Sequence, residues 1–448
     1  MALLRSRRLE GLFGGGLDAV TAEQVRTLVD LHVVEAFDLD FKAQLYGRSD
    51  AEKRDLAGDV AALANTAGGV IIIGVAEDDH ARAASAPGIE VSDAEVARVR
   101  QVVASGVSPL PAFDVFTVLD DPDSGHGFML IAVPQSVLAP HAVLINNALR
   151  FPTRNGATTR HLSEPEVAAA YRSRLARAAQ RTDRLEQVET ELTRRLDRSA
   201  APWIAVALVP ELPGDFTISR ASYAEFETAI RAVPVVPLDG GGLSFRRVDV
   251  GHQRLRADDS IRADDPEPWS AATDVHTDGA GAVALRLHDI RRDVQPSDPQ
   301  TDTLSDEGLS AAIIWALQFL AQHARDRAHA SGTAALRATV LPSTAVQHTT
   351  LGHWRGGFAS TIGRAVTSVP PAATYAPIDE LADCGPGLVA AAARLHHSIG
   401  HSFGVPELPQ LTLDGELVWP FWDHDRRPFV RAWADANGIQ IVGLSAGG

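Results

Sequence analysis

The residues that decide the fold read VVEAFDLDFKAQLY at 33–46, ALANTAGG at 62–69 and VIIIGVAEDD at 70–79. Within the first piece, apolar and charged residues alternate strictly over 37–42, FDLDFK. Side chains on a strand point alternately to opposite faces, so this segment is predicted to form a half-buried strand. One row of that strand then carries two carboxylates and an amine.

A helix and a second strand are predicted to follow. Leu56, Val60 and Leu63 recur at helical spacing after the first strand. The glycine pair of ALANTAGG ends the helix, because glycine readily adopts the left-handed conformation that closes one. The aliphatic run VIIIGV is typical of a buried strand, and the acidic residues 77–79 follow it. The order strand, helix, strand brings two acidic clusters together, an arrangement that can hold a divalent cation.

The use of lysine adds to this interpretation. The chain contains two lysines, Lys42 and Lys53, whereas it uses arginine everywhere else. Lysine is a compact, mobile point charge whose pKa shifts readily, so it does not replace arginine neutrally. We interpret Asp40 and Lys42 as a carboxylate–ammonium pair on one face of the strand. The alternative is a surface lysine without a special role.

Two motifs together resemble a known family. The first is A-x-x-N-T-x-G-G-x-I-I-I-G-V, which begins at residue 62, and the second is RFPTRNGATTRHLS at 150–163. They resemble the Schlafen-type AlbA-like domain over about residues 30–175, and the Asn-Thr-x-Gly-Gly piece is the most specific part. The resemblance implies a mixed α/β sheet and a function on nucleic acid.

The resemblance also implies site residues. In nuclease members of the family three carboxylates form the active site, and by position these fall on Glu35, Asp40 and Asp78. They would bind Mg²⁺ or Mn²⁺, which prefer oxygen ligands, and Lys42 would offset the charge that develops on the phosphate. Asp40 replaces the usual glutamate and reaches one methylene less far. Strict alternation puts Glu35 on the opposite face from Asp40 unless a bulge intervenes, so Asp38 is the alternative ligand.

The resemblance assigns nucleic-acid binding to three arginines, Arg150, Arg154 and Arg160. The leading expectation is a metal-dependent endoribonuclease that cleaves structured RNA such as tRNA. The first alternative is a regulator or complex subunit that binds DNA or RNA and has a degenerate site. A second alternative is an oligomerisation or scaffold protein in which the acids are only solvated.

Charge and composition limit these functions. The net charge of −16 is unfavourable for a protein that binds phosphates. Residues 150–198 nevertheless hold eleven arginines against seven acidic residues, which predicts a local basic stripe. A salt-bridged helix explains the same composition equally well. Cys384 is the only cysteine, so no cysteine-rich zinc site is expected. We find no apolar run of membrane-spanning length and expect a soluble, cytoplasmic protein.

The domain organisation follows from changes in pattern along the chain. Residues 1–30 are predicted as a helical lead, 31–175 as the α/β domain with a mixed sheet, and 176–200 as part of an arginine-rich connecting helix. Residues 201–448 are predicted as an α+β C-terminal domain, for which no motif indicates a role.

The connecting helix carries a narrow apolar seam, Leu185, Val188, Leu192 and Leu196. Such spacing favours either a coiled-coil contact or packing on the chain's own second domain. A single α/β domain offers little concave surface for a folded RNA, and two-fold pairs are the commonest oligomers, so we expect a homodimer.

Overall fold

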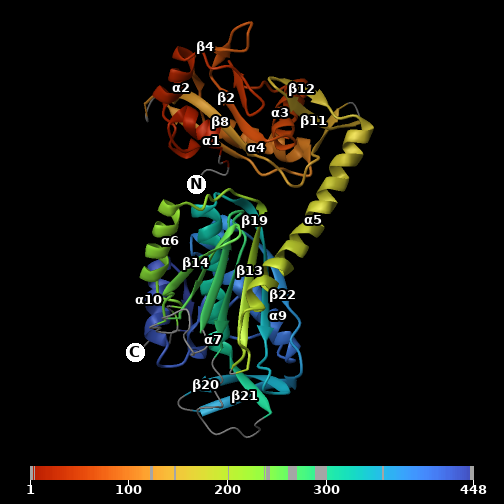
Figure 1. The fold of residues 1–448 in the computed structure, drawn as a ribbon. Helices are drawn as coiled ribbons and strands as arrows, with labels where there is room; N and C mark the ends of the chain where they lie inside the picture. Colours follow the sequence, from red (N-terminus) through yellow and green to blue (C-terminus); the bar gives the residue numbers. More distant parts are fainter. Residues whose placement is uncertain are drawn as a thin grey trace. The chain divides into compact units, whose positions relative to one another are not determined.

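The computed structural model describes residues 4, 6–121, 125–145, 148–199, 201–236, 238, 243–260, 270–287, 300–355 and 358–443 (Figure 1). The chain divides into two compact units, Met1–Ala178 and Ala179–Gly448, and the boundary lies within helix α5 (Glu164–Thr193). Both units mix helices and sheets, as the sequence predicts. None of the helices in these ranges is both long enough and apolar enough to cross a membrane.

The first unit is built on a five-stranded mixed sheet. Its strands run in the order β1-β2-β8-β5, and β7 also pairs with β8. The β1 and β2 strands are parallel, which the helical crossover between them requires, and the other pairs are antiparallel. The strands are β1 (Leu39–Lys42), β2 (Gly68–Ile73), β5 (Ile89–Glu90), β7 (Asp114–Leu119) and β8 (His126–Pro134).

Helices cover both faces of this sheet. On one face, α1 (Arg7–Phe13) and α2 (Ala22–Asp30) share a core with Leu39 and Phe41. On the other face, α3 (Asp50–Ala64) and α4 (Asp93–Gly106) pack on alternate residues of β2 and β8. The two cores confirm the predicted alternation over residues 39–42 only. Residues 37–38 form a turn in which Phe37 is exposed and Asp38 is buried, so Asp38 does not continue the row of Asp40 and Lys42.

Short strands complete the first unit. β3 (Ala76–Glu77) pairs with β4 (Ala83–Ser85), and β9 (Ala142–Ile145) pairs with both β6 (Val107–Ser108) and β10 (Ala148–Arg150). A hairpin of β11 (Pro152–Asn155) and β12 (Thr158–His161) leads into α5.

The second unit contains a seven-stranded antiparallel sheet in the order β14-β15-β16-β17-β13-β19-β22. Its strands are β13 (Trp203–Leu212), β14 (Arg247–Gly251), β15 (Arg254–Asp258), β16 (Ala271–His276), β17 (Gly281–Arg286), β19 (Ser331–Leu341) and β22 (Ala372–Pro377). Its helices are α6 (Arg220–Ala232), α7 (Asp306–Gln322), α8 (Ile378–Ala382), α9 (Pro386–Ser402) and α10 (Arg427–Asn437).

Two smaller sheets lie beside this one. The parallel pair β18 (Thr301–Ser305) and β20 (His348–Arg355) is extended by β21 (Phe358–Val366). The last strands, β23 (Leu417–Val418) and β24 (Ile441–Val442), also pair in parallel.

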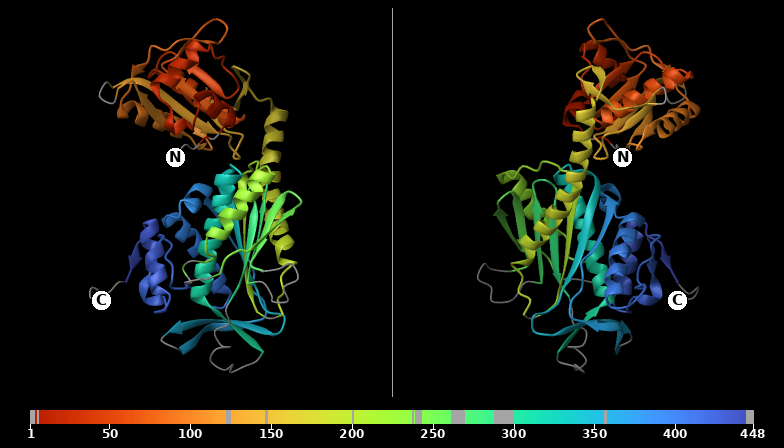
Figure 2. Two further views of the ribbon diagram at one scale, coloured as in Figure 1. Left: turned by 60° about the vertical axis from the view of Figure 1, so that its left-hand side comes forward. Right: turned by 90° about the vertical axis from the view of Figure 1, so that its right-hand side faces the viewer.

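The large sheet is covered on both faces (Figure 2). Alternate residues of β13, such as Val206 and Leu208, face α7 and α9 in the main core. The intervening residues, such as Ala207 and Val209, face the C-terminal half of α5.

The apolar seam of α5 is therefore used within the chain. Leu185, Val188 and Leu192 are buried against the large sheet, and Leu196 packs at the edge of the same cluster. Packing on the second unit is the interpretation of the seam that the structure supports. The homodimer itself stays a prediction, without these leucines as its interface.

Candidate functional site

Asp40 is buried in the middle of the first unit. Because Leu39 and Phe41 face the core under α1 and α2, Asp40 and Lys42 point to the opposite face of β1, toward α3. The residue is 2 % exposed. A charge at that depth is costly unless it is paired and hydrogen-bonded, so its partners define the site.

Two cations pair with this carboxylate. The Arg154 Nη1 donates to Asp40 Oδ1 at 2.8 Å, with side-chain exposures of 2 % and 3 %. The Lys42 ammonium donates to Asp40 Oδ2, which confirms the pair inferred from their spacing. Both carboxylate oxygens are thus engaged by positive charge.

The Asn-Thr motif positions the arginine. The Asn65 amide nitrogen donates to the carbonyls of His141 and Pro152, at 2.9 and 2.8 Å, and its oxygen accepts from the His141 amide at 2.6 Å. The hydroxyl of Thr66 accepts from the backbone N–H of Arg154 at 2.9 Å. The C-terminal end of α3 therefore fixes the β11 hairpin in the place from which Arg154 reaches Asp40.

The glycine that follows this motif brings β2 close to β1. Gly69 has φ of +156°, and a Cβ there would lie 2.5 Å from the carbonyl oxygen of Asp38. Any side chain would separate the two strands just before Asp40, so the glycine is a requirement of the close approach.

Lys42 also contacts a second carboxylate that sequence reasoning missed. Its Nζ lies 3.7 Å from Asp59 Oδ2, and the Tyr46 hydroxyl donates to the same oxygen at 2.8 Å. Burial acts to lower the pKa of Lys42, but the charges of Asp40 and Asp59 outweigh it and leave that pKa raised. Burial raises the pKa of Asp59 despite the neighbouring ammonium. Asp59 lies three residues after Leu56 and four before Leu63 on α3, the spacing of one helical face, and this was the available signal.

Glu35 lies beside this ion-pair network. Its Oε1 accepts the backbone N–H of Phe41. Desolvation by burial raises the pKa of Glu35 from its ordinary 4.5 to about 7, and the negative charges of Asp40 and Glu77 act in the same direction. Glu35 precedes the regular strand β1, so the alternation of side chains along β1 does not determine the direction of its side chain.

Asp78, the third predicted ligand, has a local role. Its Oδ1 accepts backbone N–H groups of His80 and Arg82 at 2.8 and 3.0 Å, and these bonds lower its pKa. Its exposed neighbour Glu77 is the acid whose charge acts on Glu35. In the described part of the chain, Glu35, Asp40 and Asp78 do not gather their ligand atoms within 4.8 Å of one another. The alternative ligand Asp38 pairs with Arg8 at 2.9 Å.

Part of the first unit matches a known protein family. Residues 35–163 match the family model Schlafen, AlbA_2. The Asn-Thr motif, the buried Asp40 and its partner Arg154 all lie within the matched range. The Schlafen AlbA_2 domain indicates a function related to nucleic acid. The family match does not extend into the second unit.

Comparisons with curated proteins and with solved structures assign no further function to the chain. No curated protein matches the chain. A crystal structure of the DIP2311 protein from Corynebacterium diphtheriae matches with 21 % identity and a TM-score of 0.25. The match covers 38 % of this chain and 29 % of that protein, which is too little for an argument about the whole fold.

The three arginines predicted to bind nucleic acid differ in exposure. Arg150 is exposed on β10 of the Schlafen AlbA_2 domain. Arg160 is exposed on β12 and forms two hydrogen bonds with Glu166, at 3.0 and 2.8 Å. Arg154 is buried on Asp40, so in this structure it has no exposed surface for a phosphate. In this structure the Arg154 guanidinium is an internal counter-charge for Asp40.

The arginines of the basic stripe predicted over residues 150–198 also divide into ion-paired and exposed ones. In the second unit, Arg184 pairs with Asp278 at 3.0 Å, and Arg195 pairs with the fully buried Asp274. Arg184 on α5 and Arg195 just after the helix are ion-paired to acids of the second unit, as the salt-bridge alternative predicts. The exposed arginines of the Schlafen AlbA_2 domain and the start of α5 remain available for phosphates, among them Arg150, Arg172 and Arg177.

Glu35→Gln is expected to remove part of the pH dependence of stability. Because folding raises the pKa of Glu35 to about 7, the folded chain holds that proton more tightly than the unfolded chain. The stabilisation is complete below about pH 4.5 and is lost as the pH rises through 7. Glutamine keeps an oxygen for the Phe41 amide and carries no charge. Calorimetric melts at pH 5 and pH 8 should differ more for the wild type than for the variant.

The control for this test is Glu90→Gln, at an exposed acid on β5 of the same unit. It should leave the difference between pH 5 and pH 8 as in the wild type. Equal differences for the wild type and Glu35→Gln would contradict the raised pKa of Glu35.

Proposed function

We propose that the first unit binds the phosphate backbone of a nucleic acid, and that Asp40 acts there as a buried counter-charge. The family match supports the nucleic-acid part of this proposal. The observation that carries the role of Asp40 is the pairing of both its oxygens, one with Arg154 and one with Lys42. Of the three functions that the sequence left in competition, this arrangement favours the nucleic-acid-binding protein with a degenerate site. Structured RNA such as tRNA is the substrate class that the family resemblance implies, and DNA is the alternative.

The predicted Mg²⁺ or Mn²⁺ site does not fit the residues as they are arranged. Hard cations need several oxygen ligands at about 2.0–2.6 Å. Asp40 already holds two cations, and Asp78 binds the backbone of its own turn. A metal ion at Asp40 would have to displace Lys42 or Arg154 from the carboxylate oxygens.

The surface best suited to phosphates is at the β11–β12 hairpin. We define the hairpin surface as the exposed residues Arg150, Arg160, His161 and Tyr171. These residues are held together, because the Phe151 ring packs edge-on against Tyr171 and the Phe151 carbonyl accepts from the Leu162 amide. Arginine forks bind phosphate oxygens, and an exposed tyrosine ring offers a stacking face for an unpaired base.

Arg150→Gln is expected to weaken RNA binding and to flatten its salt dependence. Each phosphate contact that is lost reduces the slope of log affinity against log salt by about 0.7–0.9. The measurement is fluorescence anisotropy with a labelled tRNA, and with duplex DNA in parallel, at several salt concentrations. Arg100→Gln is the matched control, because Arg100 is also exposed but lies on α4 and pairs with Asp114. A slope that Arg150→Gln leaves unchanged would remove the hairpin surface from the footprint.

Metal-dependent cleavage of RNA is the second candidate function. The observation that favours it is the position of the partly buried Glu35, on which the negative charges of Asp40 and Glu77 both act and which a divalent cation would neutralise. Incubation of total RNA with Mn²⁺ tests it, with Glu35→Gln and Glu77→Gln as variants that keep the Asp40–Arg154 pair. Cleavage by the wild type that both variants lose would support the nuclease. Binding without cleavage supports the first proposal.

A further inference from the structure

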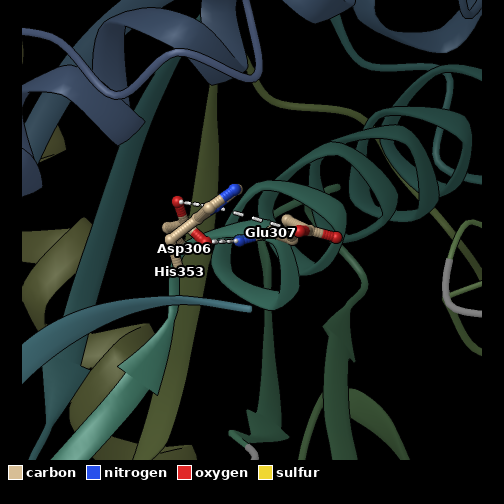
Figure 3. A group of neighbouring side chains, drawn as sticks. All are labelled: Asp306, Glu307 and His353. Atoms are coloured by element: carbon tan, nitrogen blue, oxygen red, sulfur yellow. Dashed lines mark hydrogen bonds and ion pairs between the residues drawn. The ribbon is translucent and has the colours of Figure 1, made fainter. Parts of the chain in front are cut away.

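A second cluster of ionisable residues lies in the second unit, outside the Schlafen AlbA_2 match. Asp306 and Glu307 begin helix α7 directly after β18, and His353 lies on β20. The parallel register places Ser305 opposite Gly352, which brings His353 to the start of the helix. Figure 3 shows the three side chains converging, with the imidazole facing both acids.

Asp306 is held in a fixed orientation. Its Oδ1 accepts the Glu307 backbone N–H at 2.8 Å. Its Oδ2 lies 2.6 Å from Gln410 Nε2 and 3.0 Å from His353 Nδ1. Asp306 is 1 % exposed, so these contacts determine where its oxygens point.

Glu307 leaves one oxygen unsatisfied. Its Oε2 accepts the Asp423 backbone N–H at 3.0 Å, and Arg426 Nη1 lies 3.8 Å away. Its Oε1 is buried, has no hydrogen-bond partner and lies 4.0 Å from His353 Nδ1. An ionised oxygen without a partner is costly in a protein interior, and native structures rarely contain one. The amide Oε1 of the fully buried Gln410, beside the cluster, is a second buried oxygen without a hydrogen-bond partner.

We propose that Asp306, Glu307 and His353 form a binding site for a divalent transition-metal ion such as Zn²⁺ or Mn²⁺. The three ligand atoms lie within 4.8 Å of one another. The distances of 3.0 and 4.0 Å from His353 Nδ1 to the two carboxylate oxygens suit ligands that share an ion at about 2.0–2.2 Å. One imidazole with two carboxylates selects this class, whereas Mg²⁺ and Ca²⁺ prefer oxygen alone.

The surroundings complete the site. The Gln410 amide and the Asp423 backbone orient the two carboxylates, as outer-shell groups do around protein metals. The Oε1 of Gln410 can serve as a further oxygen ligand or bind a water on the metal. The competing state without metal keeps the contact between His353 Nδ1 and Asp306 Oδ2.

The test is equilibrium dialysis of the full chain, first stripped with a chelator, against Zn²⁺ alone and against Mn²⁺ alone. The bound metal is then counted per chain. The wild type should bind one equivalent more than Glu307→Gln and than His353→Gln. Glu407→Gln and His252→Gln are matched controls, because both residues are exposed elsewhere in the second unit, and they should bind as the wild type does.

Tryptophan fluorescence supplies the second readout. All seven tryptophans follow residue 200, so the signal reports the second unit and shows whether each variant is folded. Metal that binds the folded state raises its melting temperature. This rise should appear in the wild type and in both controls and be lost in Glu307→Gln and His353→Gln. Equal metal content and equal melting shifts in the wild type and both site variants would overturn the proposal, as would a wild type that binds neither metal.

Discussion

Arg154→Met is expected to destabilise the first unit by about 3–5 kcal/mol, because removing one partner of a buried ion pair leaves the other charge uncompensated. The charge left behind is that of Asp40, which is 2 % exposed and keeps only Lys42. Amide hydrogen exchange along β2, whose residues are all buried, measures the loss. Tryptophan fluorescence should not change, since the tryptophans lie in the second unit.

A double variant separates the pair from simple loss of packing. Arg154→Met together with Asp40→Asn removes both buried charges and should recover most of the lost stability. Arg150→Met is the matched control, since it makes the same change at an exposed position of β10 and should cost little. A loss below about 1 kcal/mol for Arg154→Met would mean that Asp40 is not a buried ion in solution.

The sequence predicted the local elements around Asp40 because their patterns are local. Alternation over residues 37–42 was sufficient to place Leu39 and Asp40 on opposite faces of β1. The glycine pair was predicted to end the helix, but α3 ends at Ala64 with Asn65 as its C-cap, and the glycines instead begin β2, where Gly69 lies against the backbone of Asp38. Each of these inferences depends on residues close in sequence.

The partner of Asp40 could not be predicted in this way. Arg154 lies 114 residues further along the chain, and a guanidinium suits a phosphate and a buried carboxylate equally well. The choice between them depends on the hydrogen bonds that Asn65 and Thr66 make to the distant hairpin. Glu77 and Asp78 show a finer limit, because they are adjacent acids and yet Asp78 accepts from the backbone of its own turn whereas the charge of Glu77 acts on Glu35.

Composition alone also could not show which arginines in and just after α5 are ion-paired and which are exposed. Arg184 on α5 pairs with Asp278 in the turn after β16, and Arg195, just beyond the helix, pairs with Asp274 on β16. Arg172 and Arg177 in the first half of α5 are exposed. The division follows the boundary between the two units, which falls within the helix. A helical repeat shows which residues share one face of the helix, but it does not show which of those faces packs against a sheet.

Leu192→Glu is expected to unfold the second unit or to destabilise it by more than about 3 kcal/mol. Truncating a buried leucine to alanine costs about 2–5 kcal/mol, and a carboxylate placed in an apolar cluster adds a desolvation cost. Leu192 is fully buried among Trp203, Ala207 and Ala284. Urea unfolding followed by tryptophan fluorescence measures the effect, and Trp203 is itself a reporter within the cluster.

The matched control is Leu175→Glu on the same helix, where the leucine is 71 % exposed and the change should leave the unfolding midpoint unaltered. Light scattering on the same samples separates packing from association. If the seam instead joined two chains, Leu192→Glu would halve the mass of the wild-type particle and leave the fluorescence transition in place. Because the cluster around Leu192 is formed within one chain, we expect the transition to shift and any wild-type assembly to depend on other surfaces.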